Sequence, residues 1–386
     1  MKVMLTKTGG VMCADTTNAT PIGDTTNLFM GLVRYLNDHH DVRVFGQVRG
    51  NPGVPVAQPD VSGLDEFDTP ETVKARYDAA VDKITHDGWQ PDACVDIAGQ
   101  QCTSSWVGNP RCTGVQQRGI KYVAPSLYAM ERLKTPRICL VHDPRAYPIN
   151  HEMHYWDWCR PRAVLTLHET SVHVFKSLDK TATAYRTYSR GGPWWSYGLK
   201  PYAKKDNRPQ PGLCIAHGHF ADGRLNRRGV RHQPWGALLN GYDGPDIEIV
   251  GKDWDEFSLP PACEWLGTVP PGECIVRLRT AKCGPIVPID DRFTTSKLRQ
   301  YVLNGCLPLP YGRGEEVLTW DHRGEFCALD SDCRVTSARE LEDAVRRACE
   351  DEDWRQARIK QMLKLTEPDF STLEKAMRLE LKGYEL

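Results

Sequence analysis

The sequence has almost no net charge: its 386 residues include 49 Lys and Arg against 50 Asp and Glu, a formal charge of −1. This excludes a strongly basic protein that coats nucleic acid and an acidic solvating tail. It does not exclude a local basic face, because binding responds to local potential rather than to the charge sum. Hydrophobic residues make up 40% of the chain, with 11 Trp and 14 Tyr, so disorder of the whole chain is excluded as well.

The chain also lacks any apolar run of the about 18 residues that suggest a membrane-spanning helix. The apolar start, from Met1 to Leu5, is broken at once by Lys7 and Gly9, which is unlike a signal peptide. The 14 cysteines are scattered, and no two have the C-x-x-C spacing of a zinc site or a redox pair. We therefore expect a cytosolic protein with no membrane partner, whose thiols are reduced and mostly buried.

Short apolar segments alternate with helical ones along most of the chain, which predicts parallel, doubly wound α/β sheets. Strands are expected at residues 2–6, 41–45, 93–98, 137–142, 163–167, 212–216, 246–250, 263–267, 286–289, 306–309 and 326–329. Helices are expected at 24–35, at 296–304 and within the charged segment 338–381. The helix at 296–304 has Thr294 or Thr295 as its expected N-cap and Gly305 at its C-cap position.

The stretch from about Tyr185 to Pro211 has a different composition. It holds paired tryptophans, paired lysines and several Gly and Pro residues, which is typical of a linker. At roughly 150 residues per domain, the length also favours two or three domains. We therefore expect two α/β lobes that form a cleft, with ligands beyond the carboxyl ends of the strands.

One candidate catalytic group follows a predicted strand. His142 and Asp143 come directly after the apolar run 137–141, and Pro144 and Arg145 follow them. A carboxylate at the carboxyl end of a buried strand can act as a general base. An Asp-Pro pair is also a common turn, and the residues alone leave both interpretations open.

Two further segments have the chemistry of an anion site. Gly218 and Gly223 precede a helix start with Arg224, Arg227 and Arg228, so that loop amides and guanidinium groups can bind a diphosphate. This segment matches neither the G-x-G-x-x-G nor the P-loop pattern, and a solvated basic helix is the alternative.

The second of these segments is 290–309, in which hydroxyl-bearing residues open a helix. Lys297 and Gln300 lie about one turn apart on one face near that start. Amides and hydroxyls there suit phosphate groups, and a simple capped helix is the alternative.

His151, Glu152, His154 and Asp157 have helical spacing that would suit a metal ion. They lack a further assignable ligand, so surface histidines are favoured and no protein-held metal centre is expected there. The neighbouring aromatic residues are favoured as core.

Between Tyr185 and Arg231 the chain has ten basic residues against two acidic ones, although the whole sequence is neutral. The basic residues are Arg186, Arg190, Lys200, Lys204, Lys205, Arg208, Arg224, Arg227, Arg228 and Arg231. Tryptophan and tyrosine residues are interleaved with them, and this combination is typical of nucleic-acid binding. A basic linker is the alternative.

These segments, in this order, resemble the DNA β-glucosyltransferases of T-even bacteriophages, which have the GT-B glycosyltransferase fold. The resemblance is spread over most of the chain. The run from Gly23 to Phe29 resembles the family's helix opening, where an acidic residue contacts the sugar, and this implies that role for Asp24. The strand end around Asp143 and Arg145 resembles the Asp-x-Arg element, which implies Asp143 as the catalytic base with Arg145 beside it. This is the most specific local match.

The second half resembles the family's donor site. Gly218, His219 and Phe220 match a Gly-x-Phe loop, but Ala221 stands where a phosphate-binding arginine is expected. The resemblance implies that Arg224, Arg227 or Arg228 substitutes for that arginine.

Two more elements complete this donor site. Gly267 and Val269 match the Gly-x-Ile-Pro turn whose backbone reads uracil. The helix that holds phosphate and ribose is matched by Thr295, Ser296, Lys297 in place of an arginine and Gln300 in place of a glutamate. An amide can still hydrogen-bond a ribose hydroxyl, although more weakly than a carboxylate.

The resemblance implies a GT-B fold of two Rossmann-like lobes facing a central cleft, with a C-terminal helix that crosses back to the first lobe. The expected parts are an acceptor-binding lobe at 1–190, a basic linker at 191–211, a nucleotide-sugar-binding lobe at 212–366 and a helix at 367–386 packed on the first lobe.

The predicted reaction is inverting transfer of a sugar from a UDP-sugar, with UDP-glucose as the expected donor, to the hydroxyl of a 5-hydroxymethyl pyrimidine in phage double-stranded DNA. Asp143 would take the proton, and the target base would flip out of the duplex. Mg²⁺ or Mn²⁺ is a candidate cofactor, and a monomer in the cytoplasm of the infected bacterial host is expected. The alternatives are a GT-B enzyme for a polysaccharide or small-molecule acceptor and a non-catalytic DNA-binding protein on the same scaffold.

Overall fold

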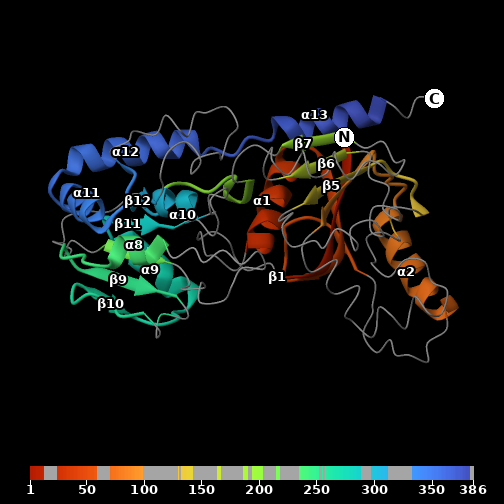
Figure 1. Ribbon diagram of the computed structural model, residues 1–386. Helices are drawn as coiled ribbons and strands as arrows, with labels where there is room; N and C mark the ends of the chain where they lie inside the picture. The colour runs from red at the N-terminus through yellow and green to blue at the C-terminus, as the bar shows by residue number, and fades with distance from the viewer. Residues whose placement is uncertain are drawn as a thin grey trace. The chain divides into compact units, whose positions relative to one another are not determined.

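Two parallel β-sheets with flanking helices form the framework of the computed structural model (Figure 1). The structure describes residues 1–12, 24–58, 70–98, 129, 132–141, 163–166, 186–189, 194–202, 214–217, 234–251, 254, 257–287, 297–311 and 333–382. They form two units. The first contains the described residues up to Gly198 and those from Pro368 onward, and the second contains those from Leu199 to Glu367.

The first unit has a seven-stranded sheet in the order β3-β2-β1-β4-β5-β6-β7, with parallel pairing throughout. The strands are β1 (Lys2–Met12), β2 (Asp41–Arg49), β3 (Val56–Ala57), β4 (Ala93–Ala98), β5 (Arg137–Val141), β6 (Ala163–Thr166) and β7 (Arg186–Ser189). The strand order reverses between β1 and β4. Sheets of this kind bind ligands beyond the carboxyl ends of the strands at such a point.

Side chains alternate between the two faces of this sheet. Leu5 of β1 and Val95 and Ile97 of β4 belong to one apolar cluster. Thr6 and Asp96 project to the opposite face, because successive residues of a strand alternate. Both are fully buried, and the Thr6 hydroxyl donates a 2.7 Å hydrogen bond to Asp96 Oδ1. Both faces of the sheet are therefore covered, as is usual for parallel sheets.

Among the described residues, three helices pack on the apolar cluster of the first unit: α1 (Asp24–His39), α13 (Ser371–Lys382) and the short 3-10 helix η3 (Trp194–Ser196). Helix α2 (Pro70–Thr85) contributes none of its described residues to this cluster and contacts β3. Leu28, Leu32 and Leu36 recur at every fourth position of α1 and lie in the cluster, as do Leu373 and Met377 of α13. Figure 1 shows α13 beside β6 and β7. The C-terminal helix therefore returns to the first unit.

The segment around η3 is held against α1. Arg34 donates from Nε to the carbonyl of Tyr197 at 2.8 Å and from Nη2 to that of Trp195 at 3.0 Å. A Cβ at Gly31 would lie 2.1 Å from the carbonyl oxygen of Trp194. The two backbones can therefore approach this closely only because residue 31 has no side chain.

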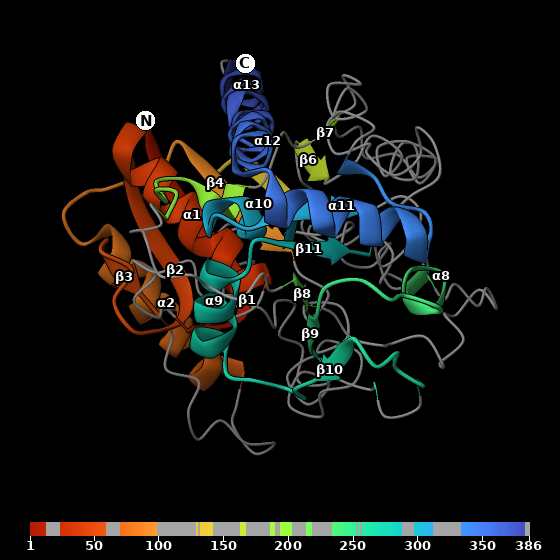
Figure 2. The same cartoon turned by 90° about the vertical axis from the view of Figure 1, so that its left-hand side faces the viewer.

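The second unit has a five-stranded parallel sheet in the order β10-β9-β8-β11-β12. The strands are β8 (Cys214–His217), β9 (Ile247–Val250), β10 (Cys263–Trp265), β11 (Cys283–Ile286) and β12 (Leu307–Pro310). Figure 2 shows β11, β8, β9 and β10 in that order.

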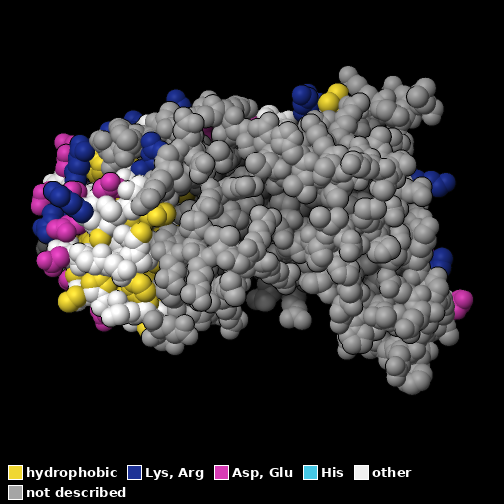
Figure 3. Space-filling view, in the orientation of Figure 1, with side chains coloured by type: hydrophobic (Ala, Val, Ile, Leu, Met, Phe, Trp, Pro, Cys, Tyr) yellow, Lys and Arg dark blue, Asp and Glu magenta, His cyan; other side chains and the backbone are white. Residues whose placement is uncertain are grey.

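The helices of the second unit are α8 (Pro234–Leu239), α9 (Pro271–Thr280), α10 (Lys297–Leu303), α11 (Ala338–Glu350) and α12 (Glu352–Leu365). Ser337 caps the start of α11: its Oγ accepts from the Glu340 N–H at 3.3 Å, and Glu340 Oε2 accepts from the N–H of Thr336, the residue before the cap, at 2.6 Å. On the face in Figure 3, the described part of this unit shows Lys and Arg side chains interspersed with Asp and Glu side chains. The unit also contains ion pairs one helical turn apart, such as Glu342 with Arg346.

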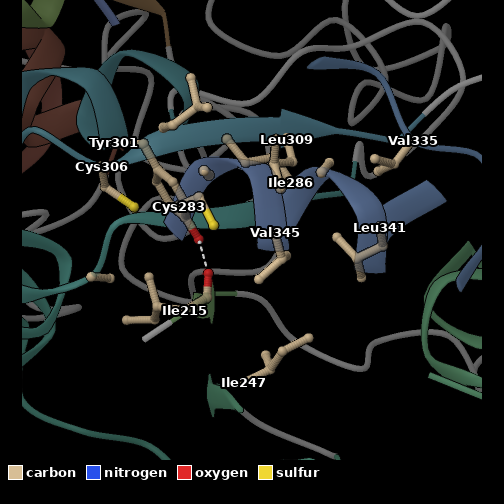
Figure 4. Packing of buried hydrophobic residues seen from close by; sticks show 14 of the residues in the cluster. Ile215, Ile247, Cys283, Ile286, Tyr301, Cys306, Leu309, Val335, Leu341 and Val345 are labelled. Atoms are coloured by element: carbon tan, nitrogen blue, oxygen red, sulfur yellow. Dashed lines mark hydrogen bonds between the residues drawn. The ribbon is translucent and has the colours of Figure 1, made fainter. Parts of the chain in front are cut away.

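The core of the second unit joins α10 to the sheet. The Tyr301 hydroxyl donates a 3.1 Å hydrogen bond to the carbonyl of Ile215 in β8 (Figure 4). A Cβ at Gly284 in β11 would lie only 1.9 Å from that carbonyl oxygen. Tyr301 can therefore reach β8 across the sheet because residue 284 is glycine.

Most of the expected elements in the described ranges are confirmed, although β1, β2 and α1 are longer than expected. The strand expected at 286–289 is wrong: β11 lies at Cys283–Ile286, and its Gly-Pro pair belongs to the strand, which pairs with β8 and β12. The linker interpretation is wrong at its start, since β7 occupies Arg186–Ser189 and pairs with β6. The strand expected at 326–329 lies outside the described residues.

No helix in the described ranges is both long and apolar enough to cross a membrane. The cysteines whose side chains are described are free thiols, and all of them except the half-buried Cys349 are buried: Cys94, Cys139, Cys263, Cys274, Cys283, Cys306 and Cys333.

Candidate functional site

The structure describes four of the residues predicted for the donor site: Gly267, Val269, Lys297 and Gln300. Asp24 is the first residue of α1, at the expected helix opening, and its backbone alone is described. The other predicted residues lie outside the described ranges: Asp143, Arg145, Gly218, His219, Phe220, Arg224, Arg228, Thr295, Ser296 and the metal candidates between His151 and Asp157.

Helix α10 is one residue shorter at each end than the helix expected at 296–304. Its end has the predicted glycine cap. Gly305, with φ at 72°, donates to the carbonyl of Val302 at 3.1 Å, and Cys306 donates to that of Tyr301 at 3.0 Å. This pair of bonds is a Schellman motif. All residues from Leu298 to Leu303 are buried, so the helix is fixed in the core.

The side-chain amide of Gln300 is buried without a hydrogen-bond acceptor. Gln300 is 5% exposed, and among the described residues no acceptor lies within reach of its Nε2. Its backbone carbonyl is occupied, since it accepts from Asn304 Nδ2 at 2.8 Å. A buried N–H left unpaired costs about 1–3 kcal/mol, so such a group marks a position where an acceptor from a ligand would stabilise the protein.

Lys297 lies near α9 at the start of α10. Burial raises the pKa of the Cys274 thiol in α9 to about 11, and the positive charges of Lys297 and Arg277 oppose this shift. The half-buried Lys297 therefore brings a positive charge to the first turn of α9.

The loop that contains Gly267 and Val269 connects β10 to α9. Gly267 has φ at 77°, where glycine is favoured, and its carbonyl accepts from the Gly251 N–H at 3.0 Å. Gly251 in turn accepts from Trp265 Nε1 at 3.0 Å. No atom lies within 4 Å of where a Cβ of Gly267 would be, so the loop backbone is open on that side.

These residues follow strands of one parallel sheet on its carboxyl-terminal side. The Gly267 loop follows β10, and α10 follows β11, so both lie beyond the carboxyl ends of parallel strands. This side of the sheet combines open loop backbone, a lysine charge and the unpaired amide of Gln300. Together these groups can bind a ligand that carries anionic and hydroxyl groups.

Sequence reasoning missed two polar residues that hold α10 in place. Arg299 is 5% exposed and donates from Nη1 to the carbonyl of Leu363 at 2.6 Å. Tyr301 is fully buried and donates to β8. The available signal was the position of Arg299 and Tyr301 between the apolar residues Leu298 and Val302.

The described ranges contain no group of three His, Cys, Asp or Glu side chains placed to hold a metal ion.

No protein-family model matches the sequence, and the search of curated proteins gives no match. Solved structures do match over nearly the whole length. A DNA-modifying β-glucosyltransferase, determined with and without uridine diphosphoglucose, is 14% identical with a TM-score of 0.54, covering 100% of this chain and 98% of its own. T4 phage β-glucosyltransferase with UDP and Mn²⁺ is 12% identical with a TM-score of 0.53, covering 100% and 99%. Anabaena HepE with UDP-glucose is 12% identical with a TM-score of 0.53, covering 99% and 100%.

At these identities the similarity shows the fold. The chain has the GT-B fold of two Rossmann-like units with parallel sheets, as the sequence predicted.

Proposed function

We propose that this chain is an inverting glycosyltransferase that moves a sugar from a UDP-sugar to the hydroxyl of a 5-hydroxymethyl pyrimidine in double-stranded DNA. The matched structures share its fold over their full length and were determined with UDP-glucose or UDP. The observation that carries the proposal is the buried amide of Gln300 without an acceptor. It stands where the sequence resemblance expects a contact to the ribose of the donor.

The donor would lie at the edge of the second sheet. The Gln300 amide would donate to a ribose oxygen, Lys297 would bind the diphosphate, and the backbone of Gly267 and Val269 would contact the uracil. The resemblance adds the remaining donor contacts: Gly218, His219, Phe220, Arg224, Arg228, Thr295 and Ser296. Charge that develops on the departing UDP would be stabilised by these amides and cations.

The chemistry would belong to the first unit. Asp143, two residues after the end of β5, would take the proton from the hydroxymethyl group of the base. The freed oxygen would bond to the anomeric carbon as the bond to the diphosphate oxygen breaks, which inverts the configuration. Asp24, at the start of α1, would contact the sugar, and Arg145 would lie beside Asp143, the catalytic base.

A DNA acceptor is supported by the basic and aromatic segment between Tyr185 and Arg231, which would bind phosphates. An enzyme cannot reach the reacting group of a base that is stacked in a duplex, so the target nucleotide would flip out of the stack. The protein would act as a monomer in the cytoplasm of an infected bacterial host.

A divalent ion such as Mg²⁺ or Mn²⁺ would be held chiefly by the diphosphate oxygens, which are the hard ligands such ions prefer. It would neutralise charge on the leaving group. Lys297, whose charge lies near α9, would supply the same neutralisation from the protein.

An alternative is a GT-B enzyme that acts on a polysaccharide or a small-molecule acceptor. HepE and the T4 enzyme match this chain with the same TM-score of 0.53, so the similarity in fold does not distinguish between the two kinds of acceptor. Such an enzyme would use the same donor site and would not need the basic segment.

The deciding experiment is incubation of duplex DNA containing 5-hydroxymethylcytosine or 5-hydroxymethyluracil with a panel of UDP-sugars, followed by nucleoside mass spectrometry. We expect a hexose mass on one modified nucleoside, and its loss in Asp143→Ala with DNA binding retained in a gel shift. Undiminished transfer by Asp143→Ala would refute the assigned base. Absence of both duplex binding and transfer, together with UDP-glucose binding, would favour the alternative acceptor.

A further inference from the structure

Within the described residues, the chain passes between its two units at two places. One lies between Gly198 and Leu199, and the other lies between Glu367 and Pro368. Helix α10 is bonded to the segments at both of these places. Tyr202, which follows the first of these places, and Thr366, which precedes the second, are both hydrogen-bonded to residues of α10.

The second passage is bonded to Arg299. Its Nη1 donates to the carbonyl of Leu363 at 2.6 Å and to Thr366 Oγ1 at 3.1 Å, at the end of α12. Thr366 is fully buried, and its hydroxyl donates to the carbonyl of Met362 at 2.7 Å. A cation that bonds the last carbonyls of a helix also interacts favourably with the helix dipole. These bonds fix the end of α12 one residue before the chain leaves the unit at Glu367.

The first passage is bonded to the other end of α10. The Tyr202 N–H donates to the carbonyl of Leu303 at 2.7 Å. The Arg279 guanidinium lies over the Tyr202 ring, 4.4 Å from its centroid, and donates from Nε to Asn304 Oδ1 at 3.1 Å. Tyr202 is thus bonded to α10 directly and through Arg279.

The two passages are also bonded to each other inside the first unit. Trp194 Nε1 donates to the carbonyl of Asp369 at 2.6 Å, and its ring stacks on Phe370 with 4.8 Å between centroids. A shift of one passage would therefore act on the other.

We propose that Arg299 is a positioning residue that couples occupancy of the Gln300 site to the conformation of both interunit passages. Gln300 adjoins Arg299 in a seven-residue helix, whose residues from Leu298 to Leu303 are buried. Such a short helix moves as a rigid body. When a ligand oxygen accepts a hydrogen bond from the Gln300 amide, the resulting shift of α10 also changes its hydrogen bonds to Thr366 and Tyr202. Coupling of this kind is reciprocal: weakening the Arg299 contacts also weakens ligand binding. This inference rests on the proposed UDP-sugar site.

The test is hydrogen exchange of the full chain with and without UDP-glucose, together with calorimetric measurement of UDP-glucose affinity. In the wild type, we expect UDP-glucose to slow exchange of the Tyr202, Thr366 and Glu367 amides. Thr366→Val removes one of the two acceptors of Arg299, together with the hydroxyl bond to the Met362 carbonyl, at nearly constant volume, and leaves the bond to the Leu363 carbonyl. It should weaken UDP-glucose binding about 2- to 10-fold, the range of one hydrogen bond, and abolish the ligand-dependent slowing at residues 366 and 367. Thr366→Ser retains the hydroxyl and should restore both.

Arg299→Met is the second variant and should act as Thr366→Val does, if it folds. The matched control is Lys364→Met, an exposed change in the same turn, which should leave both measurements unchanged. If Thr366→Val accelerates exchange equally with and without UDP-glucose, or changes neither measurement, the coupling is refuted while the donor site stands. If the wild type does not bind UDP-glucose, the donor site fails and the coupling with it.

Discussion

The hydroxyl of Tyr35 donates a 2.9 Å hydrogen bond to Oε1 of Glu374, a residue 339 positions later in the chain. The same carboxylate oxygen lies 2.7 Å from Nε2 of His40. The Tyr35 ring also stacks on Phe370, with 3.7 Å between ring centroids. Polar and aromatic contacts together therefore bind α13 to α1, and the C-terminal helix is part of the first unit's core.

Replacing Tyr35 with Phe removes the hydroxyl bond to Glu374, whereas the contact between His40 and Glu374 remains. The replacement should therefore lower the free energy of unfolding by about 1 kcal/mol. In a unit of this size that corresponds to roughly 2–4 °C in the melting temperature. Calorimetry of the full chain measures the change. Tyr202→Phe, with a ring 39% exposed, is the control and should change stability by less than about 0.5 kcal/mol. An equal effect of both substitutions would contradict the assigned bond.

The same bond predicts a dependence of stability on alkaline pH. Burial, the hydrogen bond to Glu374 and the charge of Glu374 raise the pKa of Tyr35 above its ordinary value. The folded state then holds the phenol proton more tightly than the unfolded state does. The contribution is complete below the unfolded pKa of about 10 and is lost as the pH rises through the folded value. Urea unfolding between pH 8 and 11 should show that the advantage of the wild type over Tyr35→Phe shrinks above about pH 10. A constant difference over that range would contradict this linkage.

Gly31→Ala should destabilise the first unit by about 3 kcal/mol or prevent it from folding. The added Cβ would lie 2.1 Å from the Trp194 carbonyl oxygen, and backbone cannot yield as a flexible side chain does. Gly272→Ala in α9 is the matched control, since its Cβ would meet no atom within 4 Å. Denaturation followed by circular dichroism should show the control within about 0.5 kcal/mol of the wild type, or slightly more stable. Similar stabilities of the two variants would contradict the close packing of η3 on α1.

Gln300→Met should affect stability and donor binding in opposite directions. Removing a buried N–H that has no acceptor should stabilise the ligand-free protein by about 1 kcal/mol. The lost donor bond should weaken UDP-glucose binding about 5- to 10-fold. Gln300→Glu should instead destabilise the ligand-free protein, because it buries a carboxylate. Thermal unfolding and calorimetric titration measure the two effects. A Met variant that is less stable and binds UDP-glucose normally would show that the amide is structural.

The basic segment should determine how DNA binding depends on salt. Replacing Lys204, Lys205 and Arg208 with Ala should reduce the slope of log K against log salt by up to about 2.7, at about 0.9 for each phosphate contact. Fluorescence anisotropy with a duplex at several salt concentrations measures the slope. Lys360→Ala and Lys364→Ala together, on the exposed side of α12, are the control. An unchanged slope in the triple variant would place the DNA contacts elsewhere.

The sequence alone determined the features that depend on neighbours within a few residues. Gly305 was readable as a helix end because a left-handed residue favours glycine, and the Schellman bonds link residues only a few positions apart. Apolar alternation likewise predicted the parallel strands and the two-unit fold. The order of the candidate residues Gly267, Lys297 and Gln300 resembles a donor-site pattern, and their roles stay predictions.

Tertiary structure decided what depends on residues far apart in the chain. A Gly-Pro pair is typical of a turn, yet Gly284 and Pro285 belong to β11, which lies between β8 and β12. The glycine leaves room there for the Ile215 carbonyl. Likewise, the residue type of Gln300 does not reveal that its amide is buried without an acceptor. The physical reason is that burial and long-range hydrogen bonds belong to the packed chain, whereas caps and alternation are set by local backbone geometry.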